Sequence, residues 1–273
     1  MQNNKHGFLK LLRHDLQEGM AQNLPKYALC TLFLVMNISM CFFSIRGLEL
    51  AEVPTFLDLT IYLNAGVQIF SPEDNAIPVE WLFRQVLISF LVYNYLTRDL
   101  TTYSLQTLTR IKKRSLWCAS KFLWVVCTVA LFYIIQFALT FAAAAIFGNP
   151  SFGLTLPLLL KIPGVFLNGA DFTQVAFAAV VLPFAISVAV ALMQVVLELF
   201  IKPILAFAAV AALNIITIYY ASPFLISNGS MFLRSSLANA DGINPAAVTG
   251  FLCAYIAIFT ALGLVYFRRK DIL

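Results

Sequence analysis

The residues of this chain with the most obvious chemical reactivity are two histidines and five cysteines. His6 and His14 are eight residues apart and have no set of cysteines or carboxylates around them, so their spacing predicts no metal site. The cysteines lie in or beside apolar runs and form no C-x-x-C pair: Cys30, Cys41, Cys118, Cys127 and Cys253. This placement favours small buried hydrophobic side chains over the alternatives, metal ligands or disulfides.

The motifs of common enzymes are absent from the sequence. It contains no H-E-x-x-H and no G-x-S-x-G, and neither histidine has a plausible nucleophile partner. The phosphate-binding pattern G-x-x-x-x-G-K-[ST] is missing too, so this chain does not hydrolyse ATP by that route. We therefore predict that the chain is not an enzyme and holds no cofactor of its own.

The composition is that of a membrane protein. Hydrophobic residues make up 61% of the chain and charged residues 11%, with a mean hydropathy of +0.86, whereas soluble proteins have about 45–50% and about 25%. The net charge of +5 is spread over short patches beside apolar runs, which is typical of membrane flanks and not of a nucleic-acid surface.

Six apolar runs are long enough to be predicted as membrane-spanning helices. They are 27–45, 79–96, 122–147, 175–200, 203–222 and 246–267. The second is interrupted by Arg84, four residues after Glu80, a spacing that suits a helical ion pair at the membrane rim. We expect Arg84 to be an anchor that reaches the interface, with a role in a transport path as the alternative.

The distribution of positive charge predicts the orientation of these spans. With the amino terminus inside the cell, fourteen of the eighteen lysines and arginines fall in internal segments. Both termini are therefore expected in the cytoplasm. Residues 1–26 contain an amphipathic stripe that predicts a separate helix in the inner interface. Residues 223–245 form an outer segment before the last span, and no boundary divides the single domain 1–273.

Polar residues within the predicted spans have two interpretations. Five amides are candidates for lining a polar pathway: Asn37, Asn94, Gln136, Gln194 and Asn214. Hydrogen bonding between helices is the alternative. Glu198 is placed near the cytoplasmic end of its span, where Lys202, four residues on, would form a rim ion pair.

A basic segment, 97–121, separates the second and third spans. Four apolar residues mark one helical face and four cations crowd the end of that helix: Leu100, Tyr103, Leu108 and Ile111, then Arg110, Lys112, Lys113 and Arg114. A topology anchor that touches anionic lipid explains the charge. It does not explain the amphipathic helix, because a hairpin needs only a few residues. We therefore predict a helix that a cytoplasmic partner binds.

The order of these parts resembles the permease subunits of ABC-2-type exporters, whose membrane fold is called the type V exporter fold. The resemblance covers nearly the whole chain. It is carried by the leader "GFLKLLRHDLQEGM", the segment "LTTYSLQTLTRI", the basic entry "KKRSLWCASKFLW", the outer pieces "SMFLRSS" and "INPAA", and the ending "FRRKDIL".

The resemblance implies an all-α membrane protein of six spans in the bacterial cell membrane, with "LTTYSLQTLTRI" as its coupling helix. It also implies a second permease chain, identical or a sister, and two separate ATPase subunits that bind ATP and Mg. The expected cargo is hydrophobic or amphipathic, such as a peptide, bacteriocin or antibiotic. Two alternatives stay open: a carrier or channel that works without ATP, and a membrane immunity or scaffold protein that transports nothing.

Overall fold

The fold is helical throughout the part of the chain that the structure describes. The structure is a computed structural model that describes residues 2–46, 53–68, 77–102, 114–154 and 171–269. Within these ranges every regular element is a helix. Four helical stretches are long and apolar enough to cross a membrane, and they indicate a membrane protein: Leu11–Phe43, Ser115–Phe147, Phe172–Leu197 and Pro245–Phe267.

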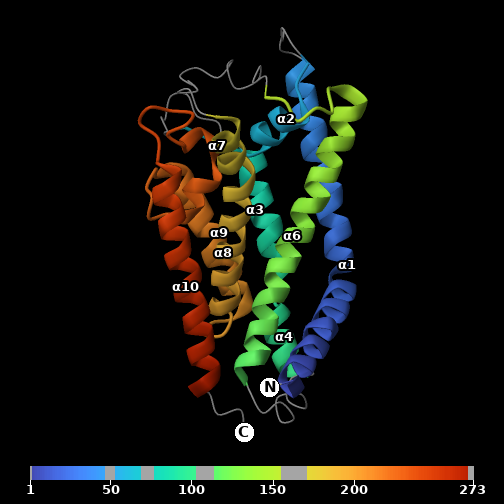
Figure 1. The fold of residues 1–273 in the computed structure, drawn as a ribbon, viewed down its shortest axis with the longest axis vertical. Coiled ribbons are helices and arrows are strands. Elements are labelled where there is room, and N and C mark those ends of the chain that lie inside the picture. The colour runs from blue at the N-terminus through green and yellow to red at the C-terminus, as the bar shows by residue number, and fades with distance from the viewer. Residues whose placement is uncertain (1, 47–52, 69–76, 103–113, 155–170, 270–273) are drawn as a thin grey trace.

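The helices form one bundle, which Figure 1 shows from the side. In chain order they are α1 (Gln2–Arg46), α2 (Phe56–Leu63), α3 (Val79–Val92), α4 (Tyr95–Thr102), α6 (Arg114–Phe147), α7 (Phe172–Ala176), the π-helix η2 (Phe177–Val181), α8 (Leu182–Leu197), α9 (Pro203–Tyr219), the 3-10 helices η3 (Ile226–Ser230) and η4 (Phe232–Arg234), and α10 (Pro245–Arg269). Helix α1 begins and α10 ends at the same end of the bundle (Figure 1), which we call the proximal end; the other is the distal end.

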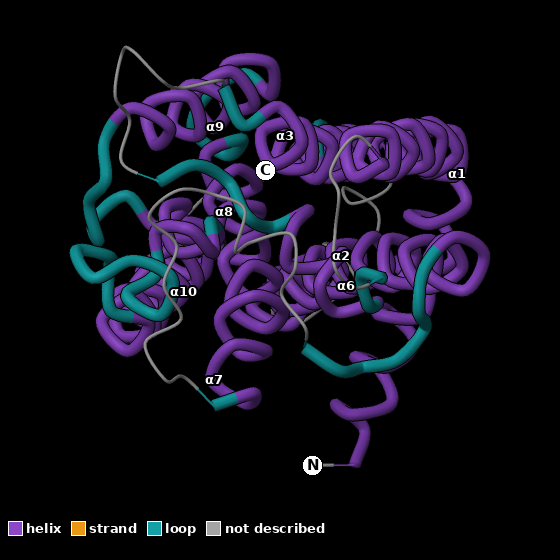
Figure 2. The backbone as a smooth tube through the Cα atoms, turned by 90° about the horizontal axis from the view of Figure 1, so that it is seen from above, coloured by secondary structure: helices purple, strands orange, loops and turns teal. Residues whose placement is uncertain are grey.

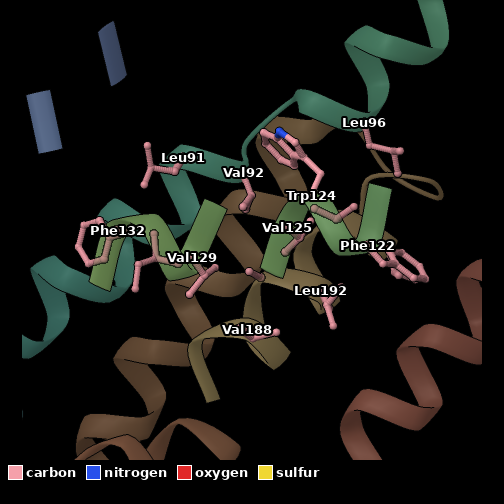
Figure 3. Close-up of a cluster of buried hydrophobic side chains, with 14 of the residues drawn as sticks. Leu91, Val92, Leu96, Phe122, Trp124, Val125, Val129, Phe132, Val188 and Leu192 are labelled. Carbon is pink, nitrogen blue, oxygen red and sulfur yellow. The ribbon is translucent and has the colours of Figure 1, made fainter. Parts of the chain in front are cut away.

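The bundle is organised around α8. This helix contacts α3, α6, α9 and α10, and the view along the bundle shows α1 and α6 side by side at one edge (Figure 2). Apolar side chains of α3, α6 and α8 meet in one cluster (Figure 3), which includes Leu91, Val125 and Leu192. Burial of such side chains against each other holds the helices at fixed positions.

All six predicted spans fall on helices, but their lengths differ. Helix α3 has 14 residues and α9 has 17, so they extend about 21 and 26 Å, against about 30 Å for the hydrocarbon core. Only four helical stretches in the described ranges reach the length of a span. The six spans and the cytoplasmic position of both termini therefore stay predictions.

The amino-terminal leader is not a helix of its own. Helix α1 runs from Gln2 to Arg46 without interruption and contains Pro25, whereas the sequence predicted a separate helix over residues 1–26. Proline removes one backbone hydrogen bond and bends a helix without ending it, and Figure 1 shows α1 changing direction along its length. The placement of the leader in the membrane interface stays a prediction.

The predicted second span, 79–96, is broken. Helix α3 ends at Val92, α4 begins at Tyr95, and Asn94 has a left-handed backbone with φ of 61°. Asparagine is one of the few residues with a side chain that adopts this conformation readily. The prediction of one continuous helix over this range was therefore wrong.

Side chains from two other helices satisfy the backbone groups that this break frees. Nδ2 of Asn23 donates to the Leu91 carbonyl at 3.1 Å, and Nζ of Lys26 donates to the Tyr93 carbonyl at 3.0 Å. Oε1 of Glu198 accepts the backbone N–H of Asn94 at 3.0 Å. Broken helices inside a membrane need such partners because no water is available there. Glu198 is thus buried at the break and is not the partner of Lys202 that the sequence predicted.

A similar compensation occurs in the helix that leads into α8. Pro183 has no backbone N–H to offer the carbonyl of Ala179, four residues before it. Nδ2 of Asn64, which directly follows α2, donates to that carbonyl at 2.6 Å. The π-helical turn η2 lies at this point. A distant amide therefore stabilises this irregular turn as well.

The distal end is held together by Arg234 of η4, which is buried. Its Nε donates to the carbonyls of Val67 at 3.1 Å and Gln68 at 3.0 Å, and its Nη1 and Nη2 donate to the carbonyls of Thr217 and Ile218. Those last two carbonyls belong to the carboxyl end of α9, where a cation is favoured. Burial lowers the pKa of Arg234 to about 10, so it remains charged at neutral pH.

Candidate functional site

The candidate site is a small polar cavity between α1, α3 and α6, which we call the Arg84 cavity. Its volume is about 10 Å³, which is room for about one water molecule. Its lining combines three apolar side chains with four polar ones: Leu34, Ile38 and Leu63, then Asn37, Glu80, Arg84 and Gln136.

Arg84 is the centre of this cavity. Its side chain lies on the second turn of α3 and is buried, with 3% of the residue exposed. Nη1 donates to the carbonyl of Leu63 at 3.2 Å. Among the described residues, Nε and Nη2 have no hydrogen-bond partner. A buried cation with two unused donors is costly, so this arrangement marks a site and not a simple packing position.

Two amide oxygens in the same cavity are also unused. Oδ1 of Asn37, on α1, and Oε1 of Gln136, on α6, are buried and accept no hydrogen bond from any described residue. Buried polar atoms in proteins nearly always have partners. Two N–H donors and two oxygen acceptors without a described partner thus belong to residues that line this cavity and come from three different helices.

The structure corrects the interpretation of Arg84 as a rim anchor. Its guanidinium is buried inside the bundle, and it forms no ion pair with Glu80, the nearest carboxylate along α3. Glu80 is exposed, although it lines the same cavity. Arg84 is buried because it lies beside α1 and α6, whose residues line the same cavity.

A separate chain of buried hydrogen bonds crosses the bundle and includes Gln85, the residue after Arg84 in α3. The hydroxyls of Tyr133 and Ser187 are 3.0 Å apart, and Oγ of Ser187 donates to Oε1 of Gln85 at 3.4 Å. Nε2 of Gln85 and Nε1 of Trp81 both donate to Oγ of Ser230, at 3.4 and 2.9 Å. The chain links α3, α6, α8 and η3 through side chains that are all buried.

The structure brings together only two of the five predicted pathway residues. Asn37 and Gln136 line the Arg84 cavity. Asn94 forms the break between α3 and α4, and Gln194 donates to the Ser89 carbonyl at 3.0 Å. Asn214 accepts from Oγ of Ser227 at 2.8 Å. Gln194 and Asn214 thus satisfy groups on other elements, Asn94 acts through its backbone, and a role for all five in a pathway stays a prediction.

A second polar cluster lies at the proximal end, around Lys121 of α6. Its Nζ is 2.6 Å from Oδ1 of Asp15 on α1 and 2.7 Å from Oδ2 of Asp99 on α4. Oγ of Ser120 donates to the other oxygen of Asp15 at 2.5 Å, and Nζ of Lys121 donates to the hydroxyl of Tyr95 at 3.3 Å. We call Asp15, Asp99 and Lys121 the proximal ion cluster. Because it is buried, it fixes the leader and α4 to α6.

Asp99 and Lys121 of the proximal ion cluster lie within the predicted coupling segment, 97–121, on either side of its predicted helix, 100–111. Asp99 lies on α4, which ends at Thr102, and Lys121 lies two turns beyond the start of α6 at Arg114. Leu100 packs against the apolar core. The other predicted coupling residues, Tyr103, Leu108, Ile111, Lys112 and Lys113, lie outside the described residues.

Sequence reasoning missed the polar residues that both sites depend on. It placed Arg84 at the membrane rim and did not single out Asp15, Asp99 or Lys121. One signal was present, because an ionisable residue inside or beside an apolar run is by default a candidate for a functional site. Their partners could not be found in this way, since they are on other helices.

A family model described as "Protein of unknown function (DUF2705)" matches residues 32–273. The chain belongs to the DUF2705 family. The matched range includes Asn37, Arg84 and Gln136, so the whole polar part of the Arg84 cavity lies within the DUF2705 region. It begins inside α1 and does not include Asp15. No curated protein matches the sequence.

Proposed function

We propose that this DUF2705 protein is the membrane subunit of an ATP-driven exporter of the ABC-2 type, energised by a separate ATPase subunit. The observation that carries the proposal is the proximal ion cluster, because it joins residues on either side of the predicted coupling helix. The resemblance of the sequence to ABC-2-type permeases supports the same assignment.

The proximal ion cluster gives the coupling segment a mechanical connection to the bundle. Asp99 directly precedes the predicted coupling helix, 100–111, and Lys121 lies ten residues after it, and their ion pair holds the two flanks together. Asp15 extends the connection to α1. Such an ion pair is buried and therefore little screened by salt. A partner that moves the segment would then move α1, α4 and α6 as one unit and shift the population of two bundle states.

The energy for this movement has to come from another chain. The sequence has no phosphate-binding loop, so two ATPase subunits are proposed to bind ATP and Mg and to dock against the segment. A second permease chain, identical or a sister, would complete the transporter in the bacterial cell membrane, where its outer surface contacts lipid.

An apolar groove supports a hydrophobic or amphipathic cargo. It lies between α1 and α6 towards the distal end, has a volume of about 380 Å³, and is lined by Val35, Phe42, Leu139 and Ile146 among others. A groove of this size and composition fits an apolar chain or side chain. Peptides, bacteriocins and lipophilic antibiotics belong to this class of cargo.

The proposal is tested by purifying the chain together with an ATPase encoded beside it. Leu108→Asp and Ile111→Asp should abolish copurification and ATP-dependent transport, because they place a charge on the apolar face of the predicted coupling helix. Thr109→Asp is the matched control, since residue 109 falls on the opposite face of that helix, and it should leave both unchanged.

Two results would contradict the proposal. One is unchanged assembly and transport in Leu108→Asp and Ile111→Asp. The other is transport by the purified chain in proteoliposomes, driven by an ion gradient with no nucleotide, which would favour a carrier.

A further inference from the structure

We propose that the Arg84 cavity binds the carboxylate of a ligand that also carries a hydrogen-bond donor next to it, such as the carboxyl end of a peptide. This proposal rests on the proposed function in one respect: it takes the ligand to be the cargo of the exporter. The binding itself needs no ATPase and is measured without one.

The free side of the Arg84 guanidinium has the shape of a carboxylate site. Nη1 is occupied by the carbonyl of Leu63, while Nε and Nη2 are without partners among the described residues. The N–H groups on Nε and Nη2 lie on one edge of the planar guanidinium and point the same way. That edge holds the two oxygens of a carboxylate by parallel, charge-assisted hydrogen bonds.

The charge of Arg84 calls for an anion inside the bundle. A guanidinium keeps its proton in proteins, so burial cannot make it neutral. No described carboxylate forms an ion pair with it. A ligand carboxylate would supply the missing negative charge in a place where water cannot.

The two amide oxygens make the site more selective. Oδ1 of Asn37 and Oε1 of Gln136 can only accept hydrogen bonds. A peptide end carries an amide N–H one bond away from the carbon that bears its carboxylate. Such a ligand satisfies the donors of Arg84 and one of these acceptors together, whereas a fatty acid satisfies only the donors.

The lining side chains must move apart to admit the carboxylate of a ligand, because the cavity as it stands has room for about one water molecule. Its volume is about 10 Å³, and its one exposed polar wall is Glu80. The rest of a peptide would lie beside Glu80, the exposed residue of the lining. The negative charge of Glu80 at this position repels a second carboxylate and lowers the affinity of the site.

The experiment is a binding titration with the purified full-length chain in detergent micelles. The probes are acetyl-Leu-Phe-Leu with a free carboxylate, the same tripeptide as its amide, and decanoate. We expect the free acid to bind at least about tenfold more tightly than the amide, the size of a charge-assisted hydrogen bond. Decanoate should bind more weakly than the tripeptide acid. Equal binding of the acid and the amide would overturn the proposal, and tighter binding of decanoate would assign the site to a fatty acid and overturn the peptide ligand.

Variants separate this site from unspecific attraction. Arg84→Gln should remove the preference for the acid because it removes the charge. Arg84→Lys should remove it too, because lysine keeps the charge but lacks the planar edge that holds both carboxylate oxygens. Lys202→Gln, which removes a charge from an exposed residue, is the matched control and should keep it. Gln136→Leu should weaken the tripeptide acid and leave decanoate unchanged, and it tests the site even if the Arg84 variants fail to fold.

Glu80→Gln distinguishes the ligand from an internal counter-ion. If the proposal holds, this variant folds normally and binds the acid more tightly, because the repulsion by Glu80 is gone. If Glu80 itself turns inward to pair with Arg84, Glu80→Gln will be destabilised and the acid will show no preference over the amide. That outcome would overturn the carboxylate site while leaving the proposed exporter untouched.

Discussion

Replacing Lys121 with methionine should be among the most damaging single changes in this bundle. The residue is 1% exposed, and its Nζ lies 2.6 Å from Asp15 and 2.7 Å from Asp99. Methionine has a similar length but no charge, so Lys121→Met leaves two carboxylates facing each other without a cation. Breaking a buried ion pair from one side costs about 3–5 kcal/mol in the free energy of unfolding.

The two carboxylates should contribute unequally. Asp15 is 4% exposed, whereas the side chain of Asp99 is 21% exposed, so solvent can replace more of the contact at Asp99. We expect Asp15→Asn to cost about 1–3 kcal/mol, the range for a hydrogen bond to a charged group, and Asp99→Asn to cost less. The triple variant, which combines Lys121→Met with Asp15→Asn and Asp99→Asn, should be more stable than Lys121→Met alone. Replacing a whole buried ion cluster is often close to neutral.

The measurement is a titration of unfolding with SDS in mixed micelles, read by tryptophan fluorescence. Lys202→Met, at an exposed lysine, is the matched control and should change the free energy of unfolding by less than about 0.5 kcal/mol. The ranking should persist between about 0.05 and 0.5 M NaCl, since buried pairs are weakly screened. If Lys121→Met and Asp99→Asn cost the same, or if high salt removes the effect, the cluster is a surface contact and the reasoning fails.

Three further changes test other packing and backbone features. Gly19→Ala should cost about 1–3 kcal/mol in thermal unfolding, because the new Cβ would lie 2.2 Å from Nε1 of Trp124; Gly250→Ala, with nothing within 4 Å, should be stabilising by up to about 1 kcal/mol. Asn94→Val should lower the free energy of unfolding by about 1–2 kcal/mol, because the backbone φ of 61° at this position disfavours a β-branched side chain. Asn94→Gly should be nearly neutral. Unfolding by urea or SDS would show whether the two variants differ. Arg234→Met should increase proteolytic cleavage at the distal end, and Arg234→Lys should do so less, because lysine retains the charge.

Hydropathy was sufficient to locate the helices of this protein. Each predicted span falls on one or more helices, with 79–96 divided between α3 and α4, because long apolar runs in lipid must satisfy their own backbone hydrogen bonds. The same signal could not give helix lengths. The apolar run 203–222 continues beyond the end of α9 at Tyr219, since an exposed turn at a helix end can be as apolar as the helix itself.

The candidate site was partly predictable. Asn37 and Gln136 were identified as polar residues within spans, and the structure places both at one cavity. Arg84 was assigned to the membrane rim because its distance from the end of an apolar run was the only available guide. Its neighbours in space come from α1 and α6, more than forty residues away in the chain, and no periodicity within α3 identifies them.

The break between α3 and α4 shows most clearly why sequence could not give the rest. Residues 93 and 94 are tyrosine and asparagine, and no glycine or proline marks the end of a helix there. The groups that make the break possible are Asn23, Lys26 and Glu198, which pair with backbone atoms around it. In isolation each of these three is an ordinary polar residue near a span. In the folded chain their positions determine where the helix stops, so the cause of a local feature lies in two distant segments.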